Sequence, residues 1–301
     1  MVKSPAGHLQ VQVVLFKNDL PAIWRLMWGV TAAVRQAAAE FDLTATLAFG
    51  DCSPVPVLRP EDTEALRREA VEAGLEDLGY IYFNDNLGSS GGSNRLAEQS
   101  ESDLILVLNP DTYPVPNMLR ILIRALDDAD IGVAEARHIP LEHPKAYHPV
   151  TGDTSWASGC CLLVRREVFR AVGGFDHDHF PLYCDDVDFS WRVRLAGYRV
   201  VHVPRAVVFH GKQMTLSGGP VPASTEVYHG TLGRLMLATR YSRPDILAET
   251  MSSVSAAGDP VQKQALADFE ARRAEGRVPA PIEDASRVAE FVGGEYAQHR
   301  F

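Results

Sequence analysis

The first hundred residues alternate short apolar runs with segments of helical periodicity, and this alternation restricts the fold more than any other feature. The apolar runs are rich in β-branched residues and bounded by turn residues, as is typical of buried strands. Expected strands cover 9–16, 43–54, 80–84 and 102–109, and expected helices cover 18–41 and 59–79. The sequence therefore predicts an α/β fold with a Rossmann-like, mostly parallel central sheet flanked by helices.

Polar side chains follow several of these expected strands. Asp51, Asn86 and Asp111 each come directly or closely after a strand. In open sheets with parallel strands, ligands bind beyond the carboxyl ends of the strands. We therefore expect these three side chains at the edge of the sheet where the chemistry takes place.

The second half of the chain is less regular. A helix is expected at 117–129, followed by an irregular stretch at 138–154, a strand and a helix within 158–175, a second helix that ends at Gly197, and an extended run up to His210 that Pro204 interrupts. From about residue 216 the chain becomes linker-like, and 223–301 has the pattern of helices without a repeat. We predict a domain at 1–215 and a C-terminal helical extension at 216–301.

The charge and cysteine content exclude several classes of protein. The chain has 301 residues and a formal net charge of -10, and it lacks a basic stripe, so nucleic acid is not an expected partner. Its four cysteines have no CxxC spacing, which favours reduced thiols in a cytoplasmic protein. We find no targeting segment and no apolar run long enough to span a membrane.

A glycine-rich segment, "NLGSSGGSN" at 86–94, follows the third expected strand. We expect a loop there, with a short helix at about 94–99. Glycines allow backbone N–H groups to approach a diphosphate or a nucleoside closely. The dinucleotide-binding pattern GxGxxG is absent, and a plain turn explains the segment equally well.

An acidic turn, "LNPDT", contains Asp111 just after the fourth expected strand. A single carboxylate binds Mg²⁺ or Mn²⁺ weakly, but these cations complete their coordination with water and phosphate oxygens. The alternative is an Asx turn or a cap for the following helix, and without other motifs that alternative is favoured.

Three acids, Asp185, Asp186 and Asp188, crowd the expected start of the helix at 185–198. The helix dipole favours one or two of them, but three repel one another, and this raises at least one pKa, as suits a general base. The alternative is a capped surface helix with Arg192 and Arg194 as counterions. By itself, His210 at the end of an apolar strand is more typical of a structural residue than of a metal ligand, and the "HDH" at 177–179 is interpreted as a loop.

In their order, these motifs resemble the family 2 inverting glycosyltransferases of the GT-A fold, especially their bacterial rhamnosyltransferase-like branch. The resemblance covers roughly residues 9–212. It rests on "NLGSSGGSNRLAEQSESDLILVLNPDT" and on "SGCCLLVRREVFRAVGGFDHDHFPLYCDDVDFSWRVRLAGYRVVHVPRAVVFH". Within the second block, glycine-phenylalanine-aspartate, the paired acids and the closing histidine occur in sequence.

The resemblance implies roles for individual residues. It places Asp111 on a divalent cation, Mg²⁺ or Mn²⁺, with Asn109 at the position of a first aspartate and His210 as a further metal or diphosphate ligand. It makes Asp186 the general base and puts Asp185 beside the acceptor. The residues that it implies for the nucleotide-sugar donor, beyond Asn109 and Asp111, are Phe16, Asn18, Asp51, Asn86, Gly88 and Asn94. "GDCSP" permits two registers for the nucleoside-binding aspartate, and "NPD" keeps one carboxylate of the usual two.

Two tryptophan-containing segments have two interpretations each. Trp156, Ser158 and Gly159 are candidate acceptor contacts, although a tryptophan that packs under a loop is an equal alternative. Trp24, Met27 and Trp28 lie close together on one expected helix and favour core packing over contact with a membrane or a second subunit.

The sequence thus predicts a metal-assisted inverting glycosyltransferase that moves a sugar from a UDP- or dTDP-sugar to a hydroxyl of a glycan, glycolipid or natural product. The alternative is a GT-A protein that binds sugar nucleotides without turnover. A nucleotidyltransferase would need a basic residue in an early glycine-rich loop. Lys17 is an early basic residue, but no glycine-rich loop surrounds it. A cytoplasmic location, peripheral contact with the inner face of the membrane and a homodimer are compatible with the sequence.

Overall fold

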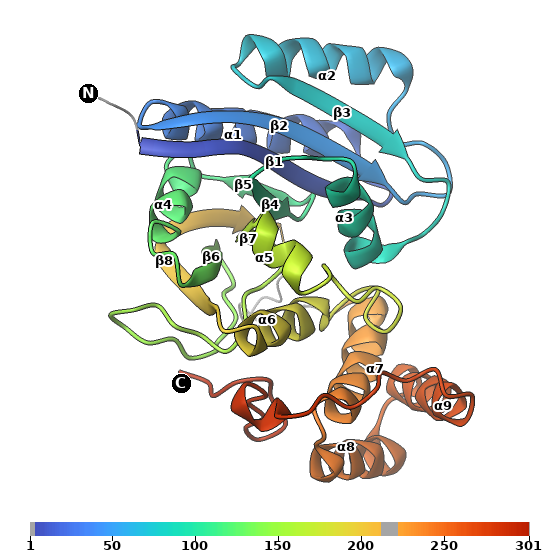
Figure 1. Cartoon of the computed structure of the whole chain (residues 1–301). Coiled ribbons are helices and arrows are strands. Elements are labelled where there is room, and N and C mark those ends of the chain that lie inside the picture. The colour runs from blue at the N-terminus through green and yellow to red at the C-terminus, as the bar shows by residue number, and fades with distance from the viewer. Residues whose placement is uncertain (1–3, 212–221, 301) are drawn as a thin grey trace.

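A computed structural model describes residues 4–211 and 222–300, and its centre is one eight-stranded sheet with the order β3-β2-β1-β4-β7-β6-β8-β5 (Figure 1). The strands are β1 (Ser4–Leu15), β2 (Phe41–Asp51), β3 (Asp77–Tyr82), β4 (Leu104–Leu108), β5 (Thr112–Pro114), β6 (Ile131–Ile139), β7 (Cys161–Arg165) and β8 (Arg199–His210). The helices are α1 (Leu20–Ala38), α2 (Pro60–Glu72), α3 (Gly88–Glu98), α4 (Met118–Ala125), α5 (Arg166–Ala171), α6 (Asp185–Leu195), α7 (Ser224–Arg240), α8 (Pro244–Ala257) and α9 (Pro260–Ala274). The predicted α/β class is confirmed.

The first four strands are parallel, and β4 is buried on both faces. Leu104, Leu106 and Leu108 of β4 pack in the core with α1 and α4, whereas Ile105 and Val107 pack in a second core with α3, α5 and α6. A strand covered on both faces needs apolar residues at every position, which explains the continuous run "LILVL". The expected β-α alternation of the first hundred residues is therefore confirmed.

The second half of the sheet is mixed. β7 is antiparallel to both β4 and β6, and β6 and β8 are parallel to each other. The sequence pattern missed β6 and β5. β8 continues through Pro204, because the pairing register jumps from Val203 to Val207 and leaves Pro204 in a bulge, where a missing N–H does no harm.

The glycine-rich segment corrects one prediction. Residues 88–98 form the helix α3 instead of a loop, and its glycines serve close packing. A Cβ atom at Gly92 would lie 2.8 Å from the methyl groups of Val14 on β1, so only glycine lets the helix approach the sheet. At Gly88, which has a φ of +69°, a Cβ would collide with the carbonyl oxygen of Pro181.

The C-terminal helices α7, α8 and α9 lie together below α6 in Figure 1 and share a core with it. Trp191 of α6 is fully buried there against Tyr241, with ring centroids 4.7 Å apart. The predicted helical tail is thus present, but the proposed boundary at 215/216 lies outside the described residues. In the described part of the chain, no helix has the length and apolar character needed to cross a membrane.

Of Trp24, Met27 and Trp28 on α1, two lie in the core and one lies at the surface. Met27 is fully buried and Trp24 packs against the core, as expected, whereas Trp28 is 51% exposed. The rings of Trp24 and Trp28 lie 5.8 Å apart. The preference for core packing is therefore confirmed for two of the three residues.

Candidate functional site

Strand pairing brings Asp111 and His210 together. Thr112 of β5 pairs with His210 at the end of β8, so the residue before Thr112 lies beside the histidine ring. The Asp111 Oδ1 lies 3.4 Å from the His210 Nε2. The Asp111 side chain is about half exposed, at 47%, while that of His210 is nearly buried. A carboxylate oxygen and an imidazole nitrogen thus face one point at the carboxyl edge of the sheet, as the resemblance implied.

The backbone around Asn109 fixes the acidic turn. The Asn109 N–H donates to the Cys160 carbonyl at 2.9 Å, and the Thr112 hydroxyl donates to the Asn109 carbonyl at 2.7 Å. The Asp111 carbonyl accepts from the Gly211 N–H at 2.9 Å. These bonds tie the turn to β7 on one side and to the end of β8 on the other.

The paired acids begin α6 beside two other predicted motifs. The Ser89 hydroxyl of α3 donates to Asp185 at 3.2 Å, and the Gly159 N–H donates to Asp186 at 2.9 Å. A further N–H, that of Val187, donates to Asp186 at 2.9 Å. The preceding Cys184 has a φ of +61°, an uncommon conformation for a residue with a Cβ, which often accompanies functional sites. Segments that are distant in sequence therefore converge at this turn.

The surroundings of the pair raise both carboxyl pKa values. Loss of hydration raises the pKa of Asp185 to about 8, and the charge of Asp186 adds to the effect. Loss of hydration also raises the pKa of Asp186, which the Gly159 N–H and the cationic Lys145 oppose. The two carboxyl groups are coupled and titrate as a pair, and both hold a proton more tightly than an ordinary aspartate does. A carboxyl group with a raised pKa suits general-base chemistry near neutral pH.

Asp188 has a different role from its neighbours. It is fully buried and accepts charged hydrogen bonds at 2.8 Å from Arg192 of its own helix and from Arg240 of α7. The Tyr241 hydroxyl donates to the same carboxylate at 3.1 Å. Asp188 therefore holds the C-terminal helices against α6. The predicted repulsion among three acids applies to two of them only.

Asp51 is enclosed by hydrogen bonds of its own loop. It is fully buried and accepts bonds from the Ser53 and Val57 N–H groups at 2.9 Å and from the Tyr80 hydroxyl at 2.5 Å. This arrangement shapes the loop after β2. It does not present the carboxylate to solvent, so its role toward the donor stays a prediction.

The other residues predicted to bind the nucleotide-sugar donor differ in their exposure and in their hydrogen bonds. Phe16 is 47% exposed, and its N–H donates to the Asn18 side chain at 2.8 Å, which shapes the turn after β1. The Asn86 side chain accepts from the Gly88 N–H at 3.3 Å. The Asn94 amide binds both the carbonyl and the N–H of Phe175, at 2.7 and 2.9 Å, and thereby anchors the glycine-phenylalanine turn. As ligands of the donor, these residues remain predictions.

The predicted acceptor segment 156–159 rests on a buried charge cluster that the sequence did not reveal. Trp156 is 8% exposed, and the Lys145 Nζ lies 3.8 Å from its ring centroid. Lys145 forms a buried ion pair with Glu135 at 2.9 Å, and Glu135 also accepts from the Ser158 N–H at 2.9 Å. Trp156 thus packs under the loop, which was the alternative interpretation. A charged residue inside the apolar run "IGVAEARHI" was the available signal for Glu135.

Another group surrounds His210. Ligand atoms of His138, Cys160 and His210 lie within 4.8 Å of one another, and all three residues are buried. Burial lowers the pKa of His138 to about 4, so this imidazole is neutral near pH 7. The sequence analysis singled out neither His138 nor Cys160, since both fall within stretches that otherwise have the pattern of core or loop.

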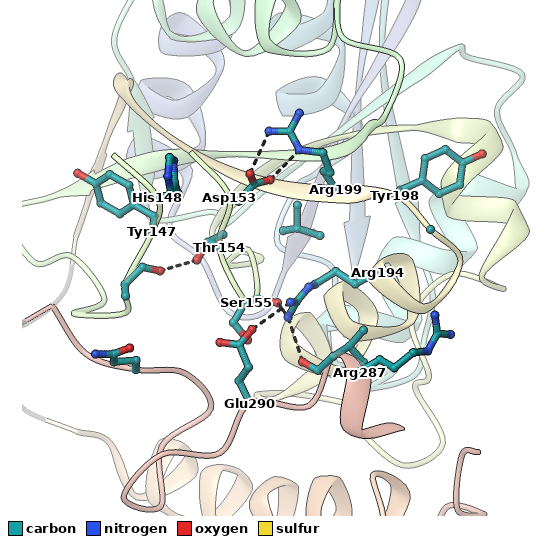
Figure 2. Close-up of a pocket in the computed structure, with 15 residues that line it drawn as sticks. Tyr147, His148, Asp153, Thr154, Ser155, Arg194, Tyr198, Arg199, Arg287 and Glu290 are labelled. Atoms are coloured by element: carbon teal, nitrogen blue, oxygen red, sulfur yellow. Dashed lines mark hydrogen bonds and ion pairs between the residues drawn. The ribbon is translucent and has the colours of Figure 1, made fainter. Parts of the chain in front are cut away.

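A cavity of about 580 Å³ lies elsewhere, between the 146–155 segment, the start of β8 and the C-terminal segment (Figure 2). Two of its three arginines form ion pairs: Arg199 bonds Asp153 at 2.7 Å, and Arg194 bonds Glu290 at 3.0 Å. None of the predicted site residues lines it. The cavity lies at Arg199, at the opposite end of β8 from His210, so we do not assign the active site to the cavity.

Comparison with curated proteins finds rhamnosyltransferases. The chain is 37% identical over 141 residues to an N-acetylglucosaminyl-diphospho-decaprenol L-rhamnosyltransferase of Mycobacterium tuberculosis, which is 46% of this chain and 45% of that protein. It is 42% identical over 55 residues to the rhamnosyltransferase WbbL of Escherichia coli K12, 18% of this chain and 20% of that protein. The chain thus spans less than half of the length of these relatives. A scan against descriptions of protein families finds no match.

Comparison with solved structures finds glycosyltransferases over most of the chain. The mannosyltransferase PcManGT of Pyrobaculum calidifontis, solved with GDP-Man and Mn²⁺, has a TM-score of 0.57 at 15% identity and covers 88% of this chain and 80% of its own. GalNAc-T7, solved with UDP, GalNAc and Mn²⁺, has a TM-score of 0.61 at 12% identity and covers 91% and 56%. The expected resemblance is thus confirmed: the chain has the GT-A glycosyltransferase fold, and the two curated relatives described above are rhamnosyltransferases.

Proposed function

We propose that this chain is a rhamnosyltransferase-like, inverting glycosyltransferase that uses a UDP- or dTDP-sugar. One observation carries the proposal most directly. Two consecutive residues join the two acidic motifs, because the Gly159 N–H binds Asp186 and the Cys160 carbonyl accepts from the N–H of Asn109. A cation motif and a base are thereby held next to one another, as sugar transfer requires.

Asp111 and His210 would hold the divalent cation. Their oxygen and nitrogen atoms suit Mg²⁺ or Mn²⁺, and the half-exposed carboxylate leaves room for water and phosphate ligands. Both structural neighbours described above were solved with Mn²⁺, which supports a cation of this kind. When bound, the cation supplies positive charge that stabilises the departing diphosphate.

Asp186 would act as the base. It accepts the proton of the acceptor hydroxyl while the hydroxyl oxygen forms a bond to the anomeric carbon, and the bond from that carbon to the diphosphate oxygen breaks. Attack from the face opposite the leaving group inverts the configuration without a covalent intermediate. Asp185, whose pKa is raised, would bind the acceptor.

A glycolipid is the acceptor class that the comparisons favour. The Mycobacterium tuberculosis relative is named for an acceptor in which a sugar is linked through a diphosphate to decaprenol. Glycans and natural products with a hydroxyl group are the other acceptors of the proposal. Peripheral contact with a membrane, a cytoplasmic location, a homodimer and the division into 1–215 and 216–301 remain predictions.

The second candidate is a GT-A protein that binds sugar nucleotides without turnover. Two observations motivate it: "NPD" offers a single carboxylate, and Asp51 is fully buried within its own loop. The raised pKa values of Asp185 and Asp186 argue against it, since a pure binding protein gains nothing from two buried acids that repel each other. Binding without transfer or donor hydrolysis across an acceptor panel would favour it.

Thermal shift tests the donor site. Nucleoside diphosphates and sugar nucleotides are added with and without Mn²⁺ or Mg²⁺ to the wild type and to Asp111→Ala. A ligand at a hundred times its Kd stabilises the folded state by about 2.7 kcal/mol. We expect a cation-dependent shift with one nucleotide series and its loss in Asp111→Ala. Absence of a shift with every nucleotide would contradict the proposal.

A further inference from the structure

Three buried side chains with nitrogen and sulfur ligand atoms meet at the inner side of the proposed donor-cation site. One ligand atom each of His138, Cys160 and His210 lies within 4.8 Å of the other two. Their exposed fractions are 3%, 4% and 7%. Asp111 lies on the outer side, with its Oδ1 atom 3.4 Å from the His210 Nε2.

The fold positions these residues through the sheet. His138 of β6 pairs with Val208 of β8, and His210 follows two positions later on the same face of β8. Cys160 precedes β7 and is held by the bond from the Asn109 N–H to its carbonyl. The cluster is therefore built on two neighbouring strands and on the turn that leads into β7, which favours a defined geometry for a ligand.

A separate observation indicates that a ligand belongs here. In the part of the chain that the structure describes, the buried His138 Nε2 has no hydrogen-bond partner. A buried polar atom without a partner costs roughly 1–3 kcal/mol, so such atoms are rare and call for an explanation. Coordination of a metal ion at the cluster would give this imidazole a role.

We propose that His138, Cys160 and His210 form a binding site for a thiophilic divalent cation, Zn²⁺, which shares His210 with the proposed site for Mg²⁺ or Mn²⁺ but adds a thiolate and a second imidazole. Two imidazoles and one thiolate are a typical zinc set, whereas Mg²⁺ and Mn²⁺ prefer oxygen. The bond lengths of tetrahedral zinc place ligand atoms about 3.5 Å apart. The three ligand atoms lie within 4.8 Å of one another, so the side chains would close around the ion when it binds, and water or Asp111 would complete the four ligands.

The site has a consequence for catalysis that rests on the proposed function. His210 is shared between the zinc ligands and the proposed donor-cation site, so zinc occupancy withdraws the histidine from the donor's cation. Zn²⁺ would then reduce the stabilisation that Mn²⁺ and the nucleotide give together. Binding of Zn²⁺ itself needs no nucleotide, so it can be measured whether or not the chain transfers sugar.

The test is a titration of the metal-free, full-length chain with Zn²⁺ by calorimetry and with Co²⁺ by absorption spectroscopy. We expect one equivalent of Zn²⁺ to bind and Co²⁺ to give a thiolate-to-metal charge-transfer band. Cys160→Ser should lose the band and bind Zn²⁺ at least roughly tenfold more weakly. The matched control is Cys161→Ser, because the Cys161 Sγ faces the core, 3.8 Å from the Met118 Sδ, and this variant should behave as the wild type.

Two further variants keep the outcome decisive. His138→Gln, checked for folding by circular dichroism, should lose Zn²⁺ affinity if Cys160→Ser is too unstable to measure. Asp111→Ala should keep the charge-transfer band while it loses the nucleotide response, which separates failure of the zinc site from failure of the donor site. Equal Zn²⁺ affinity in the wild type and Cys160→Ser, or no binding by either, would overturn the proposal.

Discussion

Two regions meet at helix α6, and they differ in how they compensate the charges of its three aspartates. On the side of α3 and the 158–160 segment, Asp185 and Asp186 receive a hydroxyl and backbone N–H groups, and no cation among the described residues forms an ion pair with them. On the side of α7, Asp188 receives two arginines and a tyrosine hydroxyl. The charge is compensated in the second region and left largely uncompensated in the first.

The difference shows how the proposed base differs from an acid that holds the fold together. The buried Asp188 carboxylate has its charge compensated by Arg240 and Arg192. A carboxylate beside another carboxylate, with loss of hydration, holds a proton more strongly and can exchange it near neutral pH. All three acids are aspartates in the first turn of α6. Their hydrogen-bond and ion-pair partners therefore determine how each carboxyl group behaves.

Asp186→Asn should have the largest effect on the reactive side. Loss of a general base lowers kcat by roughly 10²–10⁴, which corresponds to about 3–5 kcal/mol of transition-state stabilisation. Stability should stay the same or rise, because one of two repelling acids is gone. The measurement is transfer with the donor that thermal shift identifies, alongside the melting temperature. Full activity in this variant would remove Asp186 from the mechanism.

Asp188→Asn should have the largest effect on the structural side. It leaves Arg240 and Arg192 without their buried anion, and removing one partner of a buried ion pair costs about 3–5 kcal/mol. Urea unfolding of the wild type, Asp188→Asn, Arg240→Met and the double variant gives a thermodynamic cycle, in which we expect the two losses not to add. A loss below about 1 kcal/mol would mean that the two regions do not differ as described.

The pH dependence of stability should show the third effect. The pKa of Asp185 is raised to about 8 in the folded state, against about 3.9 for an unfolded aspartate. The folded state therefore binds the proton more tightly, so this contribution to stability is present below about pH 4 and is lost as the pH rises toward 8. Asp185→Asn should flatten this part of the melting-temperature profile. Parallel profiles for the two proteins would contradict the raised pKa.

Ser89→Ala should give the smallest effect and sharpen the comparison. Its hydroxyl lowers the pKa of Asp185 by binding the ionised form, so its removal should raise that pKa further. The lost hydrogen bond is worth about 0.5–1.5 kcal/mol. This corresponds to a rise of up to about one unit in the apparent pKa of the basic limb of the pH-rate profile. Ser90→Ala is the matched control, because the Ser90 hydroxyl binds the Phe180 carbonyl and should change stability but not the profile.

The parallel half of the fold was predictable because local signals agreed there. "LILVL" is apolar at every position since both faces of β4 are covered, and the same burial sets its strand character. β5 has three residues and depends on pairing with β8, so no local pattern marks it. The helix α3 was missed because glycine lowers helix propensity, whereas close packing on Val14 requires it.

The candidate site could be predicted from the sequence where its residues lie close together in the chain. It could not be predicted where they meet only through the fold. The acids at the start of α6 and Asp111 after β4 stand out by their positions. That Asp188 differs from Asp186 depends on Arg240, more than fifty residues away. His138 and Cys160 become partners of His210 only through pairing across the sheet, and neither has a sequence context that indicates a metal ligand.

The position of Arg240 also bears on how much of the chain can stand alone. This one guanidinium bonds Asp176 in the glycine-phenylalanine-aspartate turn and Asp188 in α6, both inside the resemblance to glycosyltransferases. Among the described residues, a polypeptide that stopped at residue 215 would leave Asp176 with His179 and Asp188 with Arg192 as charged partners. We therefore expect the smallest autonomous folding unit to extend beyond the sheet, and a truncation series should find its limit after α7.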